Sequence, residues 1–128
     1  MLETGIKGRQ EVVVSDANSA KTMGSGTLDV FATPAMTALM EKTAWMSVAD
    51  QLDEGCGTVG TLLNVTHDAP TPLGMTVWCE TELVEVDGRR LVFDVAAYDA
   101  KGRSAEAATS ALLSRTKVPG ESEQEGTC

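Results

Sequence analysis

The chain has 128 residues, 42% of them hydrophobic, which is enough for one domain with one core and too little for two. Its formal net charge of -9 excludes a nucleic-acid binder or a membrane-surface protein, because both classes need a basic face to meet a polyanion. No apolar run approaches the roughly 20 residues that cross a bilayer, and residues 1–10 lack the apolar core of a signal peptide. We therefore expect a cytoplasmic protein.

The N-terminal third contains a short strand and the start of a helix. Residues 10–15 (QEVVVS) are predicted to form the strand, and the polar residues 16–26, which have no clear period, a loop. A short apolar stretch at residues 28–31 follows. Thr33 and Pro34 then predict a helix start, with Thr33 as the side-chain cap and Pro34 at the first helical position.

Residues 35–52 are predicted to form a long helix. The segment lacks Gly and Pro, is rich in Ala, Met and Leu, and carries only Glu41 and Lys42 as charges before Asp50. This pattern is typical of a helix buried on nearly all sides. Such a helix needs a sheet to cover it.

The rest of the chain supplies strands. In residues 58–67 the alternation predicts one face, made of Val59, Thr61, Leu63, Val65 and His67. Residues 75–86 and 89–98 are predicted to be two strands joined by a hairpin at Asp87-Gly88.

The last segment, residues 104–118, is rich in Ala and is compatible with a helix. We favour a strand, because a turn at residues 100–102 precedes it and the sheet gains an antiparallel neighbour. The prediction is an α+β fold with one helix on an antiparallel sheet, a single domain over residues 1–118, and a disordered acidic tail at residues 119–128.

Three residues are candidates for chemistry, and each also has an ordinary explanation. Glu41 projects from an otherwise apolar helix face, although it could pair with Lys42 or reach solvent. His67 ends a strand before a proline-bearing loop, where a histidine can also serve as a structural hydrogen-bonding residue. Thr33 lies at a helix start, whose free N–H groups suit an oxyanion, yet capping alone would explain it. Gly60 lies inside a strand, where glycine indicates a bulge or the close approach of a ligand.

Two segments carry a resemblance to a known family: FATPAMTALMEKTA (residues 31–44) and GTLLNVTHDAPTPLGMTV (residues 60–77), continued by VEVDGRRLVFDVAAYD (residues 84–99). Over roughly residues 30–90 the chain resembles the fluoroacetyl-CoA thioesterase-like branch of the hotdog superfamily.

The resemblance implies a hotdog fold, in which a five- to six-stranded antiparallel sheet wraps a long central helix. In that family a threonine, a glutamate eight residues later and a histidine 26 residues further on form the catalytic set. Thr33, Glu41 and His67 reproduce these separations. The expected substrate-binding positions are Gly60, near the thioester carbonyl, and Pro34 and Ala35 at the helix start.

The expected function is hydrolysis of a small or medium acyl-CoA, with Glu41 as either the nucleophile or the base. No metal and no cofactor are expected, because coenzyme A is part of the substrate. The resemblance also implies a homodimer, in which Thr33 and Glu41 of one subunit face His67 of the other. A dimer of dimers is left open. Fluoroacetyl-specific members carry an aromatic-rich segment before the threonine, whereas residues 15–30 contain no aromatic residue. The resemblance therefore does not extend to fluoroacetate selectivity.

Two other functions fit the same fold. A non-catalytic module that binds acyl-CoA or another acyl ligand would use the pocket without chemistry. A hotdog hydratase would place an aspartate on the loop before the helix, and this chain lacks that motif.

Overall fold

The computed structural model describes residues 2–115, and these form a five-stranded sheet with one long helix. In chain order the elements are β1 (Lys7–Val13), η1 (Asp16–Asn18), α1 (Ala20–Met23), α2 (Thr33–Ala49), β2 (Cys56–His67), β3 (Thr76–Asp87), β4 (Arg90–Asp99) and β5 (Gly102–Arg115). The predicted tail and the domain end at residue 118 lie outside the described residues.

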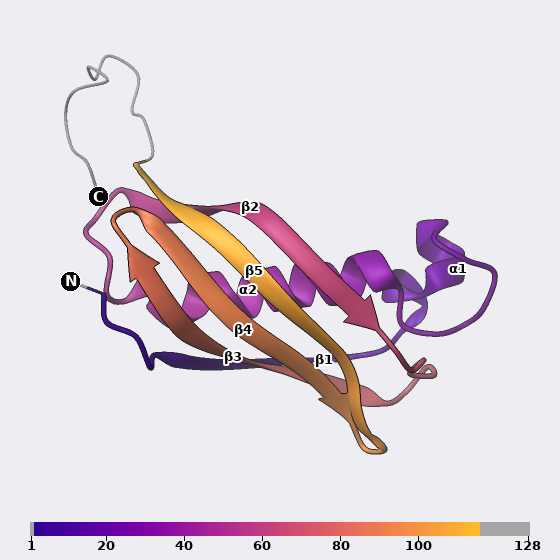
Figure 1. Ribbon diagram of the computed structural model, residues 1–128. Coiled ribbons are helices and arrows are strands. Elements are labelled where there is room, and N and C mark those ends of the chain that lie inside the picture. Colours follow the sequence, from indigo (N-terminus) through magenta and orange to yellow (C-terminus); the bar gives the residue numbers. More distant parts are fainter. Residues whose placement is uncertain (1, 116–128) are drawn as a thin grey trace, which may run out of the picture.

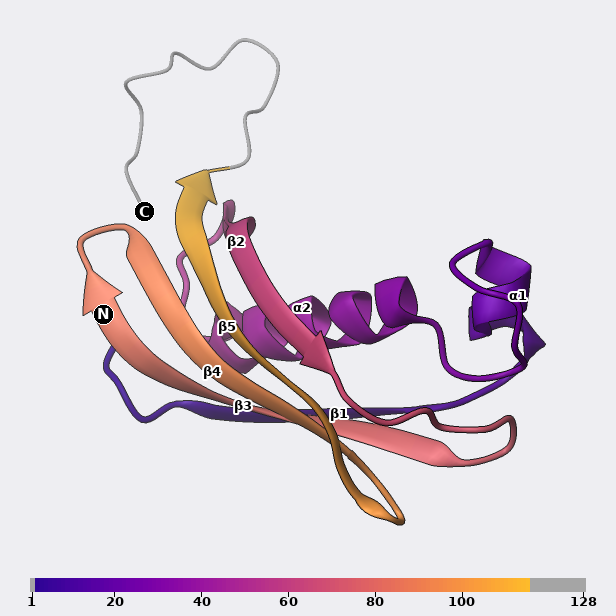
Figure 2. The same cartoon turned by 45° about the vertical axis from the view of Figure 1, so that its right-hand side comes forward.

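The sheet has the strand order β1-β3-β4-β5-β2, and each neighbouring pair is antiparallel. It curls so that α2 lies along its concave side, as Figures 1 and 2 show. The α+β layout predicted from the sequence is therefore confirmed, with five strands in the described part of the chain. β1 and β2 are the two edge strands.

The core fills the space between α2 and the concave face. The helix contributes Met36, Leu39, Met40, Thr43, Ala44 and Val48. Alternate residues of the strands complete it, including Val77, Cys79, Leu83, Leu91, Phe93, Val95, Ala97 and Ala105. Complete burial of a side chain such as Met40 or Phe93 contributes roughly 1.5–3 kcal/mol to stability, which fixes the helix against the sheet.

The opposite side of α2 is open in the single chain. Glu41, Lys42, Trp45 and Met46 are exposed there, so the prediction of a helix buried on nearly all sides is wrong for one subunit. The sheet curls around only part of the helix circumference, which leaves this side free for another surface. We call the strip where α2 and β2 lie side by side the α2–β2 seam.

The elements differ from the sequence predictions mainly before α2. Residues 16–26 were predicted to be a loop, but η1 and α1 lie there, and Ser19 caps α1 by accepting a hydrogen bond from the Thr22 N–H. α2 begins at Thr33 with Ala32 as its N-cap and no side-chain cap bond, so the prediction that Thr33 caps the helix is wrong. β5 is a strand, as predicted from the turn that precedes it, although its alanine-rich composition is compatible with a helix.

A β-bulge interrupts β2. Gly60 pairs with Ala111 and Leu62 pairs with Ser110, so Thr61 is an extra residue in the strand. Side-chain direction alternates along a strand, and one extra residue inverts it. Gly60 and His67 therefore share a face, and the prediction that Val59 shares it is wrong. Thr61, as the extra residue, has no partner in this register.

Candidate active site

The start of α2 meets the end of β2, and there two candidate residues are in direct contact. Thr33 Oγ1 lies 2.8 Å from His67 Nδ1, a hydrogen-bond distance between residues 34 positions apart. Thr33 is free for this contact because it does not cap the helix. The sequence predicted that these residues belong to one site, and the fold brings them together within a single chain.

The second nitrogen of His67 has a different environment. Nε2 is buried and has no hydrogen-bond partner among the described residues. Burial lowers the pKa of His67 below its ordinary value of 6.5, and the nearby Asp68 carboxylate acts in the opposite direction with a smaller effect. Burial therefore favours the neutral imidazole, in which one ring nitrogen contacts Thr33 and the other has no partner in the part of the chain that the structure describes.

Glu41 lies further along the same helix. It is eight residues beyond Thr33, which corresponds to about 12 Å along the axis. Within one chain, no hydrogen bond among the described residues links Glu41 to His67. The prediction that Thr33 and Glu41 together face the partner's His67 is therefore wrong for Thr33, which contacts the His67 of its own chain.

The Glu41 carboxylate packs directly on Gly60. A Cβ built on Gly60 would overlap Glu41 Oε2 and would lie 3.6 Å from Glu41 Cδ. Gly60 is not among the glycines with positive φ, so no turn geometry requires it. What requires glycine here is room for the carboxylate.

A small cavity opens beside this contact. Its volume is about 80 Å³. Glu41 and Gly60 stand among its walls, and the other lining residues are Ala44, Trp45, Thr58, Phe93, Thr109 and Ala111. The walls come from α2 on one side and from β2, β4 and β5 on the other. Apart from Gly60, sequence reasoning missed its sheet-side residues, because no local pattern shows that strands 30 to 50 residues apart line one space.

The other predicted substrate-binding residues lie in the first turn of α2. Pro34 is exposed and Ala35 is half-buried against the core. The N–H groups of a first helical turn have no acceptor within the helix, and Pro34 has no N–H, so Thr33 and Ala35 supply the free donors. These donors and the positive end of the helix dipole suit a developing negative charge beside His67.

Two further polar residues approach the same end of the molecule. Thr71, from the loop after β2, and Asp99, at the end of β4, are both buried and hydrogen-bonded to each other. Sequence reasoning did not select them. The available signals were weak: a threonine between two prolines, and an aspartate directly before a turn.

No group of three or more His, Cys, Asp or Glu side chains in residues 2–115 is arranged to hold a metal ion. None of the helices described is long and apolar enough to span a membrane.

The fold and its site define a class of protein. A long helix held by a curled antiparallel sheet is the hotdog fold. A hot-dog-like protein from Thermanaerovibrio acidaminovorans superposes with a TM-score of 0.80 at 25% identity, covering 88% of this chain and 84% of that one. The predicted hotdog fold is thus confirmed.

The sequence comparison assigns the chain to one family within this fold. The family model described as fluoroacetyl-CoA-specific thioesterase matches residues 14–113, and the chain belongs to this family. A fluoroacetyl-CoA thioesterase from Streptantibioticus cattleyicolor is 46% identical over 71 residues, which cover 56% of this chain and 51% of that protein. The chain thus matches about half the length of this curated relative.

The solved structures extend the similarity over nearly the whole chain. A variant of the fluoroacetyl-CoA-specific thioesterase FlK, in complex with fluoroacetate and CoA, has a TM-score of 0.84 at 30% identity. The superposition covers 89% of this chain and 96% of that one.

Proposed function

We propose that this protein hydrolyses a short-chain acyl-CoA thioester in the α2–β2 seam. The observation that carries the proposal is the Thr33–His67 hydrogen bond at the start of α2, with Glu41 further along the same seam. Membership of the fluoroacetyl-CoA-specific thioesterase family supports the reaction type.

His67 is proposed to transfer protons. A neutral imidazole can accept a proton at Nε2, while the bond between Nδ1 and Thr33 fixes the ring orientation. Thr33 therefore acts on His67 in the single chain.

Glu41 supports either of two balanced routes. As a base, it takes a proton from water while the water oxygen attacks the carbonyl carbon, and the C–S bond then breaks and the thiolate is protonated. As a nucleophile, its carboxylate attacks first, releases coenzyme A and leaves a mixed anhydride that water hydrolyses. In both routes the oxyanion lies beside the His67 that works with this Glu41, near the free N–H groups of Thr33 and Ala35 in the chain that supplies that His67.

The cavity beside Glu41 favours a short acyl chain. Its volume is only about 80 Å³, and Trp45 and Phe93 are among its walls, so a long acyl chain would not fit inside it. The relative complexed with fluoroacetate and CoA supports coenzyme A as the leaving group. Selectivity for fluoroacetate is not proposed, because residues 15–30 contain no aromatic side chain.

The active form is proposed to be a homodimer paired through β2. This edge strand exposes Val59 (55%) and Leu62 (62%), and α2 exposes Trp45 (48%) beside Gly60 of the same strand. Long apolar edge strands associate unless they are covered. An antiparallel pairing with its two-fold axis midway between residues 60 and 67 would bring Gly60, and the Glu41 above it, opposite the partner subunit's His67. A dimer of dimers and a cytoplasmic location remain predictions.

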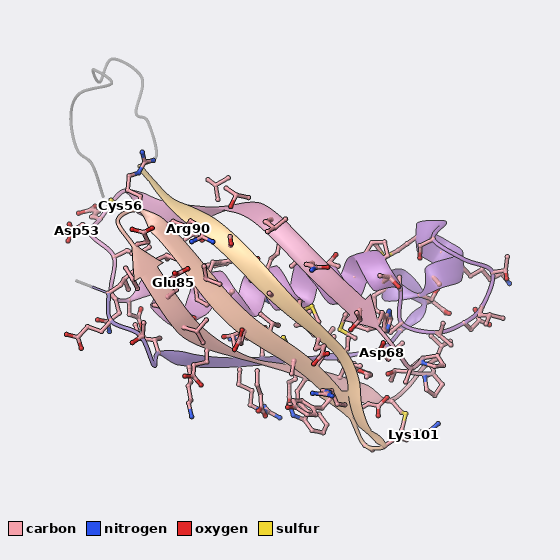
Figure 3. All side chains as sticks on the ribbon, in the orientation of Figure 1. Asp53, Cys56, Asp68, Glu85, Arg90 and Lys101 are labelled. Carbon is pink, nitrogen blue, oxygen red and sulfur yellow. The ribbon has the colours of Figure 1, made fainter. Side chains whose placement is uncertain are left out.

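The proposal is tested by thiol release from acyl-CoAs of two to ten carbons. Glu41→Gln and His67→Ala are each expected to lower kcat/KM by at least about 100-fold, the usual size of an acid–base contribution. Glu85→Gln is the matched control. Glu85 is an exposed carboxylate paired with Arg90, on the side of the molecule away from the end of β2 that carries His67 (Figure 3).

A mixing experiment tests whether the site is shared between subunits. If Glu41 of one chain works with the partner's His67, mixed dimers of the two inactive variants contain one intact site. Exchange would then restore about a quarter of the wild-type activity. If each site lies within one chain, mixing restores nothing. Leu62→Glu is expected to give an inactive monomer by light scattering.

The outcomes separate hydrolysis from its alternatives. Acyl-CoA binding without thiol release would overturn the proposal and indicate a binding module. Addition of water to an enoyl-CoA would indicate a hydratase. Full activity in both site variants would remove Glu41 and His67 from the mechanism.

A further inference from the structure

Thr71 forms hydrogen bonds in two directions from the loop between β2 and β3. Its side chain is fully buried. Its carbonyl oxygen accepts a hydrogen bond from the Phe31 N–H at 2.8 Å, and its hydroxyl donates to Asp99 Oδ2 at 2.6 Å. We call Thr71, Phe31 and Asp99 the Thr71 junction.

The hydrogen bond between Phe31 and Thr71 connects the junction to the segments that carry Thr33 and His67. Phe31 lies two residues before Thr33, and Thr71 lies four residues after His67. The N–H groups of Asp68 and Ala69 both donate to the Ser104 carbonyl, which holds the first part of the loop on β5. The backbone segments that carry Thr33 and His67 are therefore joined to each other at Thr71.

The hydrogen bond between Thr71 and Asp99 connects the junction to the hairpin that joins β4 and β5. Asp99 is 4% exposed, and its second oxygen accepts a hydrogen bond from the Lys101 N–H at 2.8 Å. A hydroxyl–carboxylate distance of 2.6 Å is typical of a strong, charge-assisted bond. Figure 3 shows Asp68 and Lys101, which flank the junction along the chain, at the end of the molecule where α2 begins.

We propose that Thr71 and Asp99 are positioning residues for the proposed reaction: they hold the Thr33 segment and the His67 segment at the separation that lets Thr33 bond to Nδ1. Neither side chain touches the substrate in this proposal. The expected effect on the reaction rate rests on the proposed thioesterase function. The expected effect on the hydrogen bond of His67 does not depend on the reaction.

The test uses the fact that His67 is the only histidine of the chain. In protein without an affinity tag, the imidazole ¹⁵N spectrum reports which nitrogen carries the proton and whether Nδ1 is bonded. Thr33→Val supplies the reference spectrum with the bond absent. Thr71→Val is expected to shift the spectrum toward that reference and to lower kcat by about tenfold, while KM changes less than about twofold, because small misplacements reduce rate more than binding.

Two variants exclude a general loss of stability. Thr71→Ser keeps the hydroxyl and is expected to restore both the spectrum and kcat. Thr43→Val removes another buried threonine bond, to the Leu39 carbonyl inside α2, and is expected to leave the His67 spectrum unchanged. If Thr71→Val does not fold, Asp99→Ala tests the same hydrogen bond, because it removes the carboxylate that accepts from the Thr71 hydroxyl.

The results distinguish the two proposals. An unchanged His67 spectrum in Thr71→Val, or in Asp99→Ala where Thr71→Val does not fold, would overturn the positioning role. A shifted spectrum combined with full hydrolysis by His67→Ala would support the junction's hold on His67 and overturn the proposed catalytic function. A shifted spectrum in Thr43→Val equal to that in Thr71→Val would show that the effect is not specific, and would also overturn the proposal.

Discussion

The two edge strands each place a glycine against α2, and the two glycines differ in what a side chain would meet. A Cβ on Gly8 of β1 would lie 2.6 Å from Ser47 Cβ, 2.8 Å from Thr81 Oγ1 and 2.9 Å from the Thr43 carbonyl oxygen. A Cβ on Gly60 of β2 would meet only the end of the Glu41 side chain.

The difference separates stability from function. At Gly8 the obstacles include helix backbone, which cannot move without displacing α2 from the sheet. At Gly60 the obstacle is the end of a flexible, exposed side chain, which can swing away. A methyl group is therefore expected to destabilise the protein at Gly8, and to displace a proposed catalytic carboxylate at Gly60.

The largest expected effect is that of Gly60→Ala on activity. Displacing the Glu41 carboxylate is expected to lower kcat/KM by about 100-fold, since errors of about 1 Å cost this much in a positioned site. The melting temperature should stay within about 2 °C of wild type, because little packing is lost. Gly57→Ala is the matched control: it lies on the same strand, with open space around the added methyl group.

Gly8→Ala should show the reverse pattern. Overpacking of this kind is expected to lower the free energy of unfolding by about 2 kcal/mol, measured by urea denaturation. The kcat per folded molecule should remain that of wild type. A catalytic loss without loss of stability would contradict the division between the two edges.

The variant Ala111→Val tests whether the cavity beside Glu41 binds the acyl group. Ala111 is buried and lines the cavity beside Glu41, so two added methyl groups would fill most of that space. The ratio of butyryl-CoA to acetyl-CoA turnover is expected to fall about tenfold, because one methylene in a pocket is worth about 1–3 kcal/mol. Equal loss on all chain lengths would mean that the acyl group lies elsewhere.

The smallest expected effect concerns pH. Because the pKa of His67 is lowered by burial, the acid limb of kcat/KM should have its midpoint below 6.5. The unfolded chain binds this proton more readily, so the contribution to stability is present above pH 6.5 and is lost as the pH falls through the folded pKa. Asp68→Asn should move the limb to still lower pH, because that carboxylate raises the pKa. A midpoint above 6.5 would contradict the burial of the ring.

The sequence predicted the architecture well where patterns are long. The helix and the three later strands are present, with ends displaced by a few residues. The predicted hairpin is also present, but its two turn residues are Gly88 and Arg89 rather than Asp87 and Gly88. β5 is the instructive case: its alanines favour a helix, but pairing with β4 and β2 on both sides decides its conformation. The short η1 and α1 were missed because elements of three and four residues leave no periodicity to detect.

For the candidate site, the sequence selected residues but could not predict their contacts. The spacing of Thr33, Glu41 and His67 selected the set, and the fold brings Thr33 to His67. Local reasoning made Thr33 a cap because the competing partner lies 34 residues away. Asp99 escaped notice for the same reason, since its partner Thr71 lies 28 residues away in another loop.

The bulge at Thr61 has a consequence for how this sequence can change over evolution. Gly60 and His67 are an odd number of residues apart, and in a regular strand they would point in opposite directions. The extra residue makes the odd count compatible with one shared face. A single insertion or deletion between these positions, unless it removed or added a bulge, would turn the imidazole toward solvent. Length changes in this stretch should therefore persist in descendants only where a bulge is lost or gained with them, or where a second change compensates.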